Sequence, residues 1–185
     1  MATFTHQVKL HVRSLSLTNV SFDTIKKSTE DVYTQYGIKI EWGPGMCLAL
    51  SEDEAKKYEQ VDGSCKWKLE PGERQDLQKL GGPIPSNEIL VFYINRFTSG
   101  SLGCGGHMPN APACIVAAHA SRWDTAHEVG HVLLTSTFSP VHSEDTNNLM
   151  HATASTYAAT PILTDSQVSQ ITSSPCCVWI PWWSR

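Results

Sequence analysis

Two histidines four residues apart constrain this chain more than any other feature of its sequence. His127 and His131 enclose Glu128 in the segment HEVGH, and the residues on both sides of that segment are largely apolar. On a helix this spacing places both imidazoles on one face, about one turn apart. Burying two histidines and a carboxylate in such a helix is costly unless something binds them. The segment therefore predicts a metal site on a buried helix.

Zinc is the cation that this arrangement favours. Neutral imidazole nitrogens bind Zn²⁺ at about 2.0–2.1 Å, and one rigid helical turn supplies two of them. Glu128 follows the first histidine directly and is expected beside the metal, where it would act as general base on a metal-activated water. A catalytic zinc also needs a third protein ligand and one open position. The candidates for that ligand are His142, Glu144, Asp145, His151 and Asp165.

Local patterns predict strands and helices in the first part of the chain. Apolar and polar residues alternate over 7–13, which is typical of a strand. The stretch 22–36 has an apolar helical face, with Ser21 as its cap and Gly37 as its stop. Ile38–Trp42 has the composition of a second strand. Strand, helix and strand at this spacing predict two parallel strands.

The same reasoning covers the remainder of the chain. We expect, in order, a short helix within 51–60, a buried strand over 89–95, a loop over 98–112, a strand over 114–119, and helices over 121 to about 135 and 164 to about 171. Both of the last two helices have start signals, Ser121 with Asp124 and Thr164 with Gln167. The whole indicates an α/β fold.

Length and composition suit one domain and exclude some partners. The 185 residues are 41% hydrophobic and 17% charged, which permits a core and argues against wholesale disorder. A net charge of −4 gives no basic surplus for phosphates, so we expect no nucleic-acid partner. No apolar run is long enough to span a membrane. The first residues lack a signal-peptide pattern, which leaves a cytosolic protein, a mature form and a domain of a longer protein open.

Six cysteines permit up to three disulfides. We favour a bond between Cys104 and Cys114, because the segment between them is rich in Gly and Pro and would close a short loop. Cys47 with Cys65 is the second choice. The alternative is a set of free buried thiols. No C-x-x-C pair occurs, so zinc is not expected on the cysteines.

The stretch from His127 to Met150, HEVGHVLLTSTFSPVHSEDTNNLM, resembles the metzincin clan of zinc endopeptidases, and most closely its matrixin branch. The clan pattern is H-E-x-x-H-x-x-G-x-x-H followed by a methionine turn. In matrixins the third histidine is followed by S-x-D-P-x-x-L-M. Here SEDTNNLM follows His142, so the Ser, Asp, Leu and Met keep their spacing, while Thr146 replaces the proline.

Two departures from that pattern lie between the second and third histidines. Ten residues separate His131 from His142, whereas the family has five. Leu134 stands where the family has the glycine that turns the chain. We expect residues 136–140 to form the return loop. An acidic third ligand from a later helix, Asp165, is the rival arrangement.

The resemblance implies a zinc-dependent endopeptidase. It assigns the ligands to His127, His131 and His142, the general base to Glu128, and the turn methionine to Met150. Peptides or proteins are then the substrates. Some metzincins stabilise the oxyanion with a tyrosine after the turn. Tyr157 is the nearest one in this chain, but its spacing is longer and favours a packing role.

The resemblance also implies an architecture. Residues 1–185 would form one catalytic domain of α/β (α+β) type, with a twisted mixed sheet and an active-site helix. The upper part would span 1–131, and a smaller lower part, 132–185, would hold the methionine turn and a C-terminal helix. An edge strand within 107–119 would bind an extended substrate through its main chain.

Two other functions stay open. One is a toxin or effector peptidase with a narrow target, delivered as part of a larger protein. The motive for it is the combination of cysteines that could form disulfides with the lack of a signal-peptide pattern. The other is a catalytically inactive metal-binding interaction module, against which the intact Glu128 argues. We expect a secreted or extracytoplasmic location and leave a cytoplasmic one open.

Overall fold

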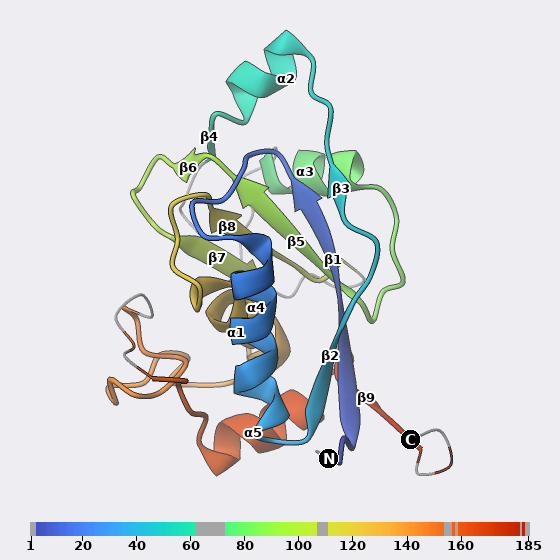
Figure 1. Cartoon of the computed structure of the whole chain (residues 1–185), viewed down its shortest axis with the longest axis vertical. Helices are drawn as coiled ribbons and strands as arrows, with labels where there is room; N and C mark the ends of the chain where they lie inside the picture. The colour runs from blue at the N-terminus through green and yellow to red at the C-terminus, as the bar shows by residue number, and fades with distance from the viewer. Residues whose placement is uncertain are drawn as a thin grey trace.

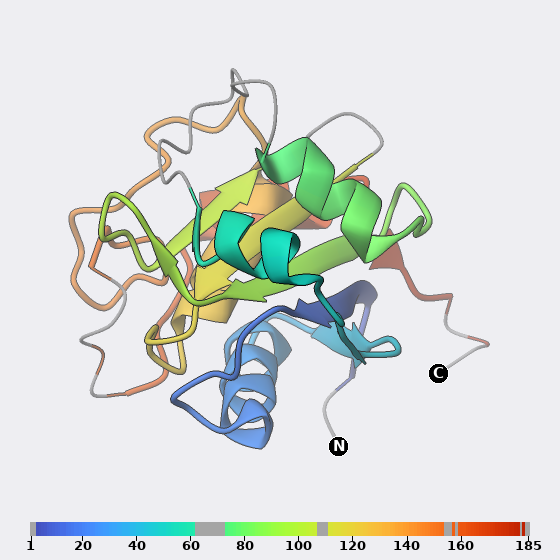
Figure 2. The same ribbon diagram turned by 90° about the horizontal axis from the view of Figure 1, so that it is seen from above.

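The computed structural model describes residues 3–61, 73–106, 111–153, 157, 159–181 and 183. In these residues a twisted, mostly parallel sheet has helices on both faces (Figures 1 and 2). Its central strands, in spatial order, are β2 (Ile38–Trp42), β1 (His6–Ser14), β5 (Ile89–Ile94), β8 (Ala113–Ala117) and β7 (Gly103–Gly106). β7 pairs antiparallel with β8, and the other three pairings are parallel. The predicted α/β fold with a mixed sheet is confirmed.

The first strand, helix and strand form as their sequence pattern predicts. Ser21 caps α1 (Phe22–Thr34), since its side chain accepts a hydrogen bond from the backbone N–H of Thr24. Gly37 follows the helix at φ +67°, a conformation that disfavours side chains. β2 then pairs in parallel with β1, with Ile38 opposite His6. The predicted parallel pair is confirmed.

Two apolar clusters lie on opposite faces of the sheet. The larger one joins the sheet to α1, α4 (Asp124–Leu134) and α5 (Asp165–Thr172). The smaller one lies beneath α3 (Glu73–Gly81), on the other face (Figure 2). All six residues of β5 are buried, as a central strand between two helical layers requires. The predicted buried strand is therefore confirmed.

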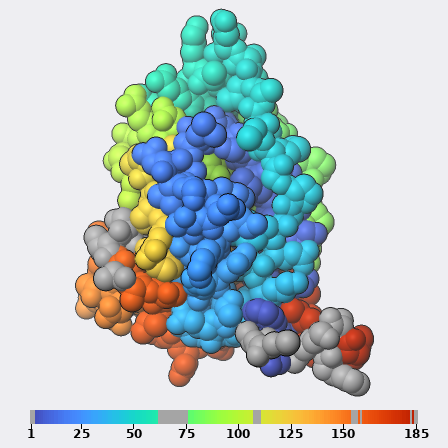
Figure 3. Space-filling view, in the orientation of Figure 1, coloured from blue at the N-terminus to red at the C-terminus, as the bar shows by residue number. Residues whose placement is uncertain are grey.

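The remaining elements are short. They are α2 (Glu52–Lys57), β3 (Met46–Cys47), β4 (Gln60–Val61), β6 (Arg96–Phe97) and β9 (Val178–Trp179). α2 is the predicted short helix, begins at a capping box between Ser51 and Glu54, and projects at one end of the molecule (Figure 3). Among the described residues, no helix combines the length and apolarity needed to cross a bilayer.

The prediction of a loop over 98–112 is wrong at Gly103–Gly106, which form the edge strand β7. Glycine has low strand propensity, so these residues carry no strand pattern. The edge strand expected within 107–119 is also misplaced, because Ala113–Ala117 is β8 and lies inside the sheet between β5 and β7. Residues 107–110 lie outside the described part of the chain.

Both predicted disulfides are wrong, because Cys114 and Cys47 are free thiols. Cys104 lies opposite Ile115 in the β7–β8 ladder, and it packs into the smaller cluster. Cys114 belongs to the larger cluster on the other face of the sheet, so its side chain points away from that of Cys104. Cys65 lies outside the described residues.

The helix with the two histidines starts three residues later than Ser121. The Ser121 N–H and hydroxyl both donate to Oδ2 of Asp124, at 2.7 and 2.6 Å, so the predicted start signal forms just before the first turn. α4 ends at Leu134, and Thr135 follows with φ +64°. The helix therefore ends at the position of the family glycine. The division of the chain into two parts at residue 131 stays a prediction.

A buried pair of amides joins the turn before Met150 to the last helix. Asn148 donates to Gln167 at 2.9 Å, and Gln167 donates back at 3.1 Å. Each amide oxygen also accepts from a backbone N–H, that of Met150 for Asn148 and that of Thr164 for Gln167. The two amides thereby hydrogen-bond to each other and to the backbone N–H groups of Met150 and Thr164.

Replacing Asn148 with Ala should lower the free energy of unfolding by about 1–3 kcal/mol, because it leaves buried partners without hydrogen bonds. Denaturant unfolding measures this loss. Asn147→Ala is the matched control, since that side chain is exposed, and it should have little effect. A double-mutant cycle with Gln167→Ala should show coupling between the two sites. Additive losses would contradict the amide pairing as the cause.

Candidate metal centre

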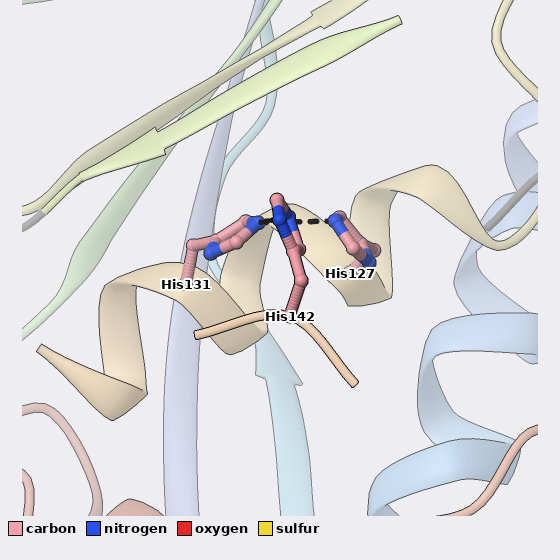
Figure 4. A group of neighbouring side chains, drawn as sticks. All are labelled: His127, His131 and His142. Carbon is pink, nitrogen blue, oxygen red and sulfur yellow. Dashed lines mark hydrogen bonds between the residues drawn. The ribbon is translucent and has the colours of Figure 1, made fainter. Parts of the chain in front are cut away.

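Three imidazoles from two segments converge on one point (Figure 4). His127 and His131 come from α4, and His142 comes from the loop that follows it. Nε2 of His131 lies 3.0 Å from Nε2 of His127 and 3.2 Å from Nε2 of His142. Their ligand atoms all lie within 4.8 Å of one another. The structure thus brings the three histidines of the sequence pattern together.

The other ligand candidates do not join this group. Within the described ranges, these histidines are the only set of three or more His, Cys, Asp and Glu side chains placed to share a metal. Asp165 is exposed at the first turn of α5, and His151 accepts hydrogen bonds from Thr153 at its Nδ1. Glu144 and Asp145 are exposed.

The spacing of the three nitrogens fits a zinc ion. Two imidazole nitrogens on one tetrahedral zinc lie roughly 3.3 Å apart. The two short separations here, 3.0 and 3.2 Å, are close to that value. The cluster reaches the surface at His142, which is exposed, while His127 is buried.

A hydrogen bond outside the cluster fixes the orientation of His127. Its Nδ1 lies 2.6 Å from the carbonyl oxygen of Leu149, so Nδ1 carries the proton and donates it to that oxygen. A neutral imidazole has a single N–H, which leaves the lone pair on Nε2, facing the other two rings. Metal-binding histidines are commonly held in this way by a backbone carbonyl.

Burial keeps the three imidazoles in the form that binds metal. It lowers the pKa of His131 to about 3, with His127 and His142 contributing charge repulsion. Burial is also the largest cause of the lowered pKa values of His127 and His142. Loss of solvation disfavours the charged imidazolium. At neutral pH all three rings are therefore neutral nitrogen donors.

The methionine of the sequence pattern lies directly beneath the histidine helix. Met150 is fully buried, and a Cβ built on Gly130 would fall 2.7 Å from its sulfur. The backbone N–H of Ser143 donates to the carbonyl of Met150 at 2.9 Å, which ties the segment of His142 to this turn. The turn thus contacts both segments that carry the histidines.

Tyr157 supports the turn. Its hydroxyl donates to the carbonyls of Asn148 and Leu149, at 2.5 and 3.2 Å. The second of these is the carbonyl that orients His127. The ring of Tyr157 packs against the larger core cluster, so its expected packing role is confirmed.

Glu128 lines a cleft of about 700 Å³ together with the three histidines. Its side chain lies against β7, and only 5% of the residue is exposed. Other walls come from residues 100–105, from most of the stretch 135–141 and from residues 152–153. The three imidazoles and the carboxylate therefore line one cleft.

Sequence reasoning missed two contributors to this site. The carbonyl of Leu149 has no side-chain signal, because backbone groups of every residue are alike. The glycines at 103 and 105 did carry one, since glycines at alternate positions often mark the close approach of another segment. We assigned them to a loop instead.

No protein-family model matches the sequence, and no curated protein matches it in sequence. Its fold is similar to that of metalloproteinase-II from Bacteroides fragilis, with a TM-score of 0.53 and 13% identity over 95% of this chain and 54% of that one. The chain thus spans about half the length of the Bacteroides protein. It is also similar to archaemetzincin from Methanopyrus kandleri, with a TM-score of 0.51 and 14% identity over 90% of this chain and 94% of that one. At these identities the likeness shows a shared fold.

Proposed function

We propose that this chain is a zinc-dependent endopeptidase in which His127, His131 and His142 hold the metal and Glu128 is the general base. The convergence of three neutral imidazole nitrogens beside a carboxylate, in an open cleft, carries this proposal. The fold shared with a metalloproteinase and an archaemetzincin supports it. Membership of the matrixin branch stays a prediction from the sequence.

The residues of the chain divide the chemistry among them. When bound, zinc supplies Lewis acidity, which polarises a peptide carbonyl and lowers the pKa of a water molecule. Glu128 accepts the proton of the attacking water and passes it to the departing amine. Leu149 holds His127 with its lone pair toward the cleft throughout. The cleft binds the peptide on either side of the scissile bond.

The alternatives have less support. The effector hypothesis depended partly on disulfides; the two pairings that we predicted do not form, although Cys104 is itself disulfide-bonded. An inactive module would have no need of a carboxylate in the cleft beside the histidines. Delivery within a larger protein and a secreted or extracytoplasmic location stay predictions from the sequence.

The replacement Glu128→Gln tests the general base. It should leave the zinc content at that of the wild type and lower kcat for peptide hydrolysis by about 10²–10⁴-fold, the usual contribution of general-base catalysis. Metal analysis and a peptide-library cleavage assay measure the two effects. Glu144→Gln is the control, because that carboxylate is exposed and outside the metal group. Full activity of Glu128→Gln would sink the mechanism.

The lowered pKa values predict how the metal-free protein responds to acid. Between the ordinary histidine pKa of 6.5 and the value of about 3 for folded His131, the unfolded chain binds more protons than the folded one. The contribution of the neutral His131 to the free energy of unfolding is therefore fully present above pH 6.5 and is lost as the pH falls toward 3. Tm should fall less steeply across this range in His131→Asn. Both proteins, the wild type and His131→Asn, are treated with chelator before the measurement. If their Tm values depend on pH in the same way, His131 is not a buried neutral imidazole in the folded protein.

The extended loop after α4 supplies an apolar wall of the cleft. Phe138 and Val141, from this loop, line the cleft with Leu102, and Phe138 and Leu102 also pack against the larger core cluster. Among the described residues that line the cleft, none is Lys or Arg, so none of them could pair with an acidic side chain. We infer that the cleft accepts peptides with an apolar side chain next to the scissile bond.

Phe138→Ala tests this preference. The loss of one apolar contact should lower kcat/KM for peptides with an apolar side chain by roughly tenfold, and it should affect peptides with a small side chain less. Cleavage of a peptide library measures the change. Thr137→Ala, in the same loop but exposed, is the control. An unchanged preference in Phe138→Ala would remove this residue from the specificity wall.

A further inference from the structure

The face of β7 that lies along α4 has no side chains. Gly103 and Gly105 point toward the helix, because alternate residues of a strand share a face. Cys104, between them, points into the smaller core cluster on the other side. The backbone of the edge strand therefore lies directly against the helix with the two histidines (Figure 1).

Glu128 occupies the space that a side chain at residue 103 would need. A Cβ built on Gly103 would fall 2.3 Å from Oε1 of Glu128 and 2.5 Å from its Cγ and Cδ. Real Cβ atoms essentially never approach another heavy atom within 3.0 Å. All three of these nearest atoms belong to the Glu128 side chain. A methyl group here would displace the carboxylate.

Gly105 sets the distance between strand and helix. Its Cβ would fall 2.3 Å from the carbonyl oxygen of Glu128 and 2.6 Å from Cβ of His131. Neither atom is at the end of a flexible side chain, so the whole strand would have to move. Gly103 therefore makes room for the carboxylate, and Gly105 lets the strand come close enough to contact it.

Backbone conformation does not explain these glycines. Among the described residues, the glycines with positive φ are Gly37, Gly82 and Gly100, so Gly103 and Gly105 adopt angles open to other residues. Glycine also weakens a strand, because it has no side chain to pack and loses more entropy on folding. What both positions share is a lack of space: a Cβ at either one would clash with Glu128, and at residue 105 also with His131.

We propose that Gly103 and Gly105 are positioning residues for Glu128: the strand without side chains holds the carboxylate beside the three histidines. The expected effect on kcat rests on the proposed function, in which Glu128 is the general base. The contact itself is independent of catalysis and can be measured as stability. A displacement of about 1 Å at a reacting group can lower a rate by about 10²-fold.

Gly103→Ala should lower kcat by about 10²-fold at unchanged zinc content, with a smaller effect on KM, because the base is displaced while the metal ligands stay. Gly45→Ala is the matched control. A Cβ there meets only Cβ of Val12, at 3.9 Å, and its φ is not positive. This control should keep the kcat and Tm of the wild type.

A thermal double-mutant cycle separates positioning from ordinary packing. Gly103→Ala should lower Tm in the wild type but not in Glu128→Ala, which removes all three clashing atoms. Gly105→Ala should lower Tm in both backgrounds, because it meets backbone and His131. Equal losses for Gly103→Ala in both backgrounds, or an unchanged kcat, would overturn the proposal. If the wild type cleaves no peptide, the proposed function fails, while the cycle still decides whether β7 holds Glu128.

Discussion

The hydrogen bond from Nδ1 of His127 to the carbonyl of Leu149 is the contact on which the candidate site depends. It links the histidine helix to the turn beneath it and sets the proton on the nitrogen that faces away from the cleft. The turn is itself fixed by the paired amides of Asn148 and Gln167 and by the hydroxyl of Tyr157. The orientation of one imidazole is thus determined by residues far along the chain, and this support resembles the outer shell of hydrogen bonds in known metal sites.

Much of the fold follows from local sequence patterns. The alternation in β1, the capped helix α1 and the apolar run of β5 each appear where the sequence predicts them, because a strand or helix with one buried face records its period in the residues themselves. The pair His127 and His131 was predictable for the same reason, since one helical turn fixes their separation. Elements whose geometry is local are the ones that a single sequence specifies.

Features that depend on long-range pairing were not predictable. β7 carries glycines where a strand pattern would need branched or aromatic residues. It is held as a strand by its hydrogen-bonded pairing with β8 and by its contact with α4. The pairing of Cys104 with Cys114 looked reasonable from their separation along the chain, but strand register puts them on opposite faces. Local reasoning likewise left five candidates for a third ligand; the family resemblance chose His142, and the fold places it beside the helix.

The extra residues between His131 and His142 cost little free energy, so the longer spacing does not prevent His142 from joining the other two histidines. The stretch between the two histidines, whose first three residues still belong to α4, is twice as long as the family's, and doubling a flexible loop costs only about 0.6 kcal/mol of closure entropy. Phe138 packs against the core near its middle, and Ser143 is hydrogen-bonded to Met150 just beyond its end. One net hydrogen bond contributes about as much as the extra residues cost. His142 can therefore keep its place while the inserted residues form a wall of the cleft, so the family spacing between second and third histidines is not a geometric requirement of this site.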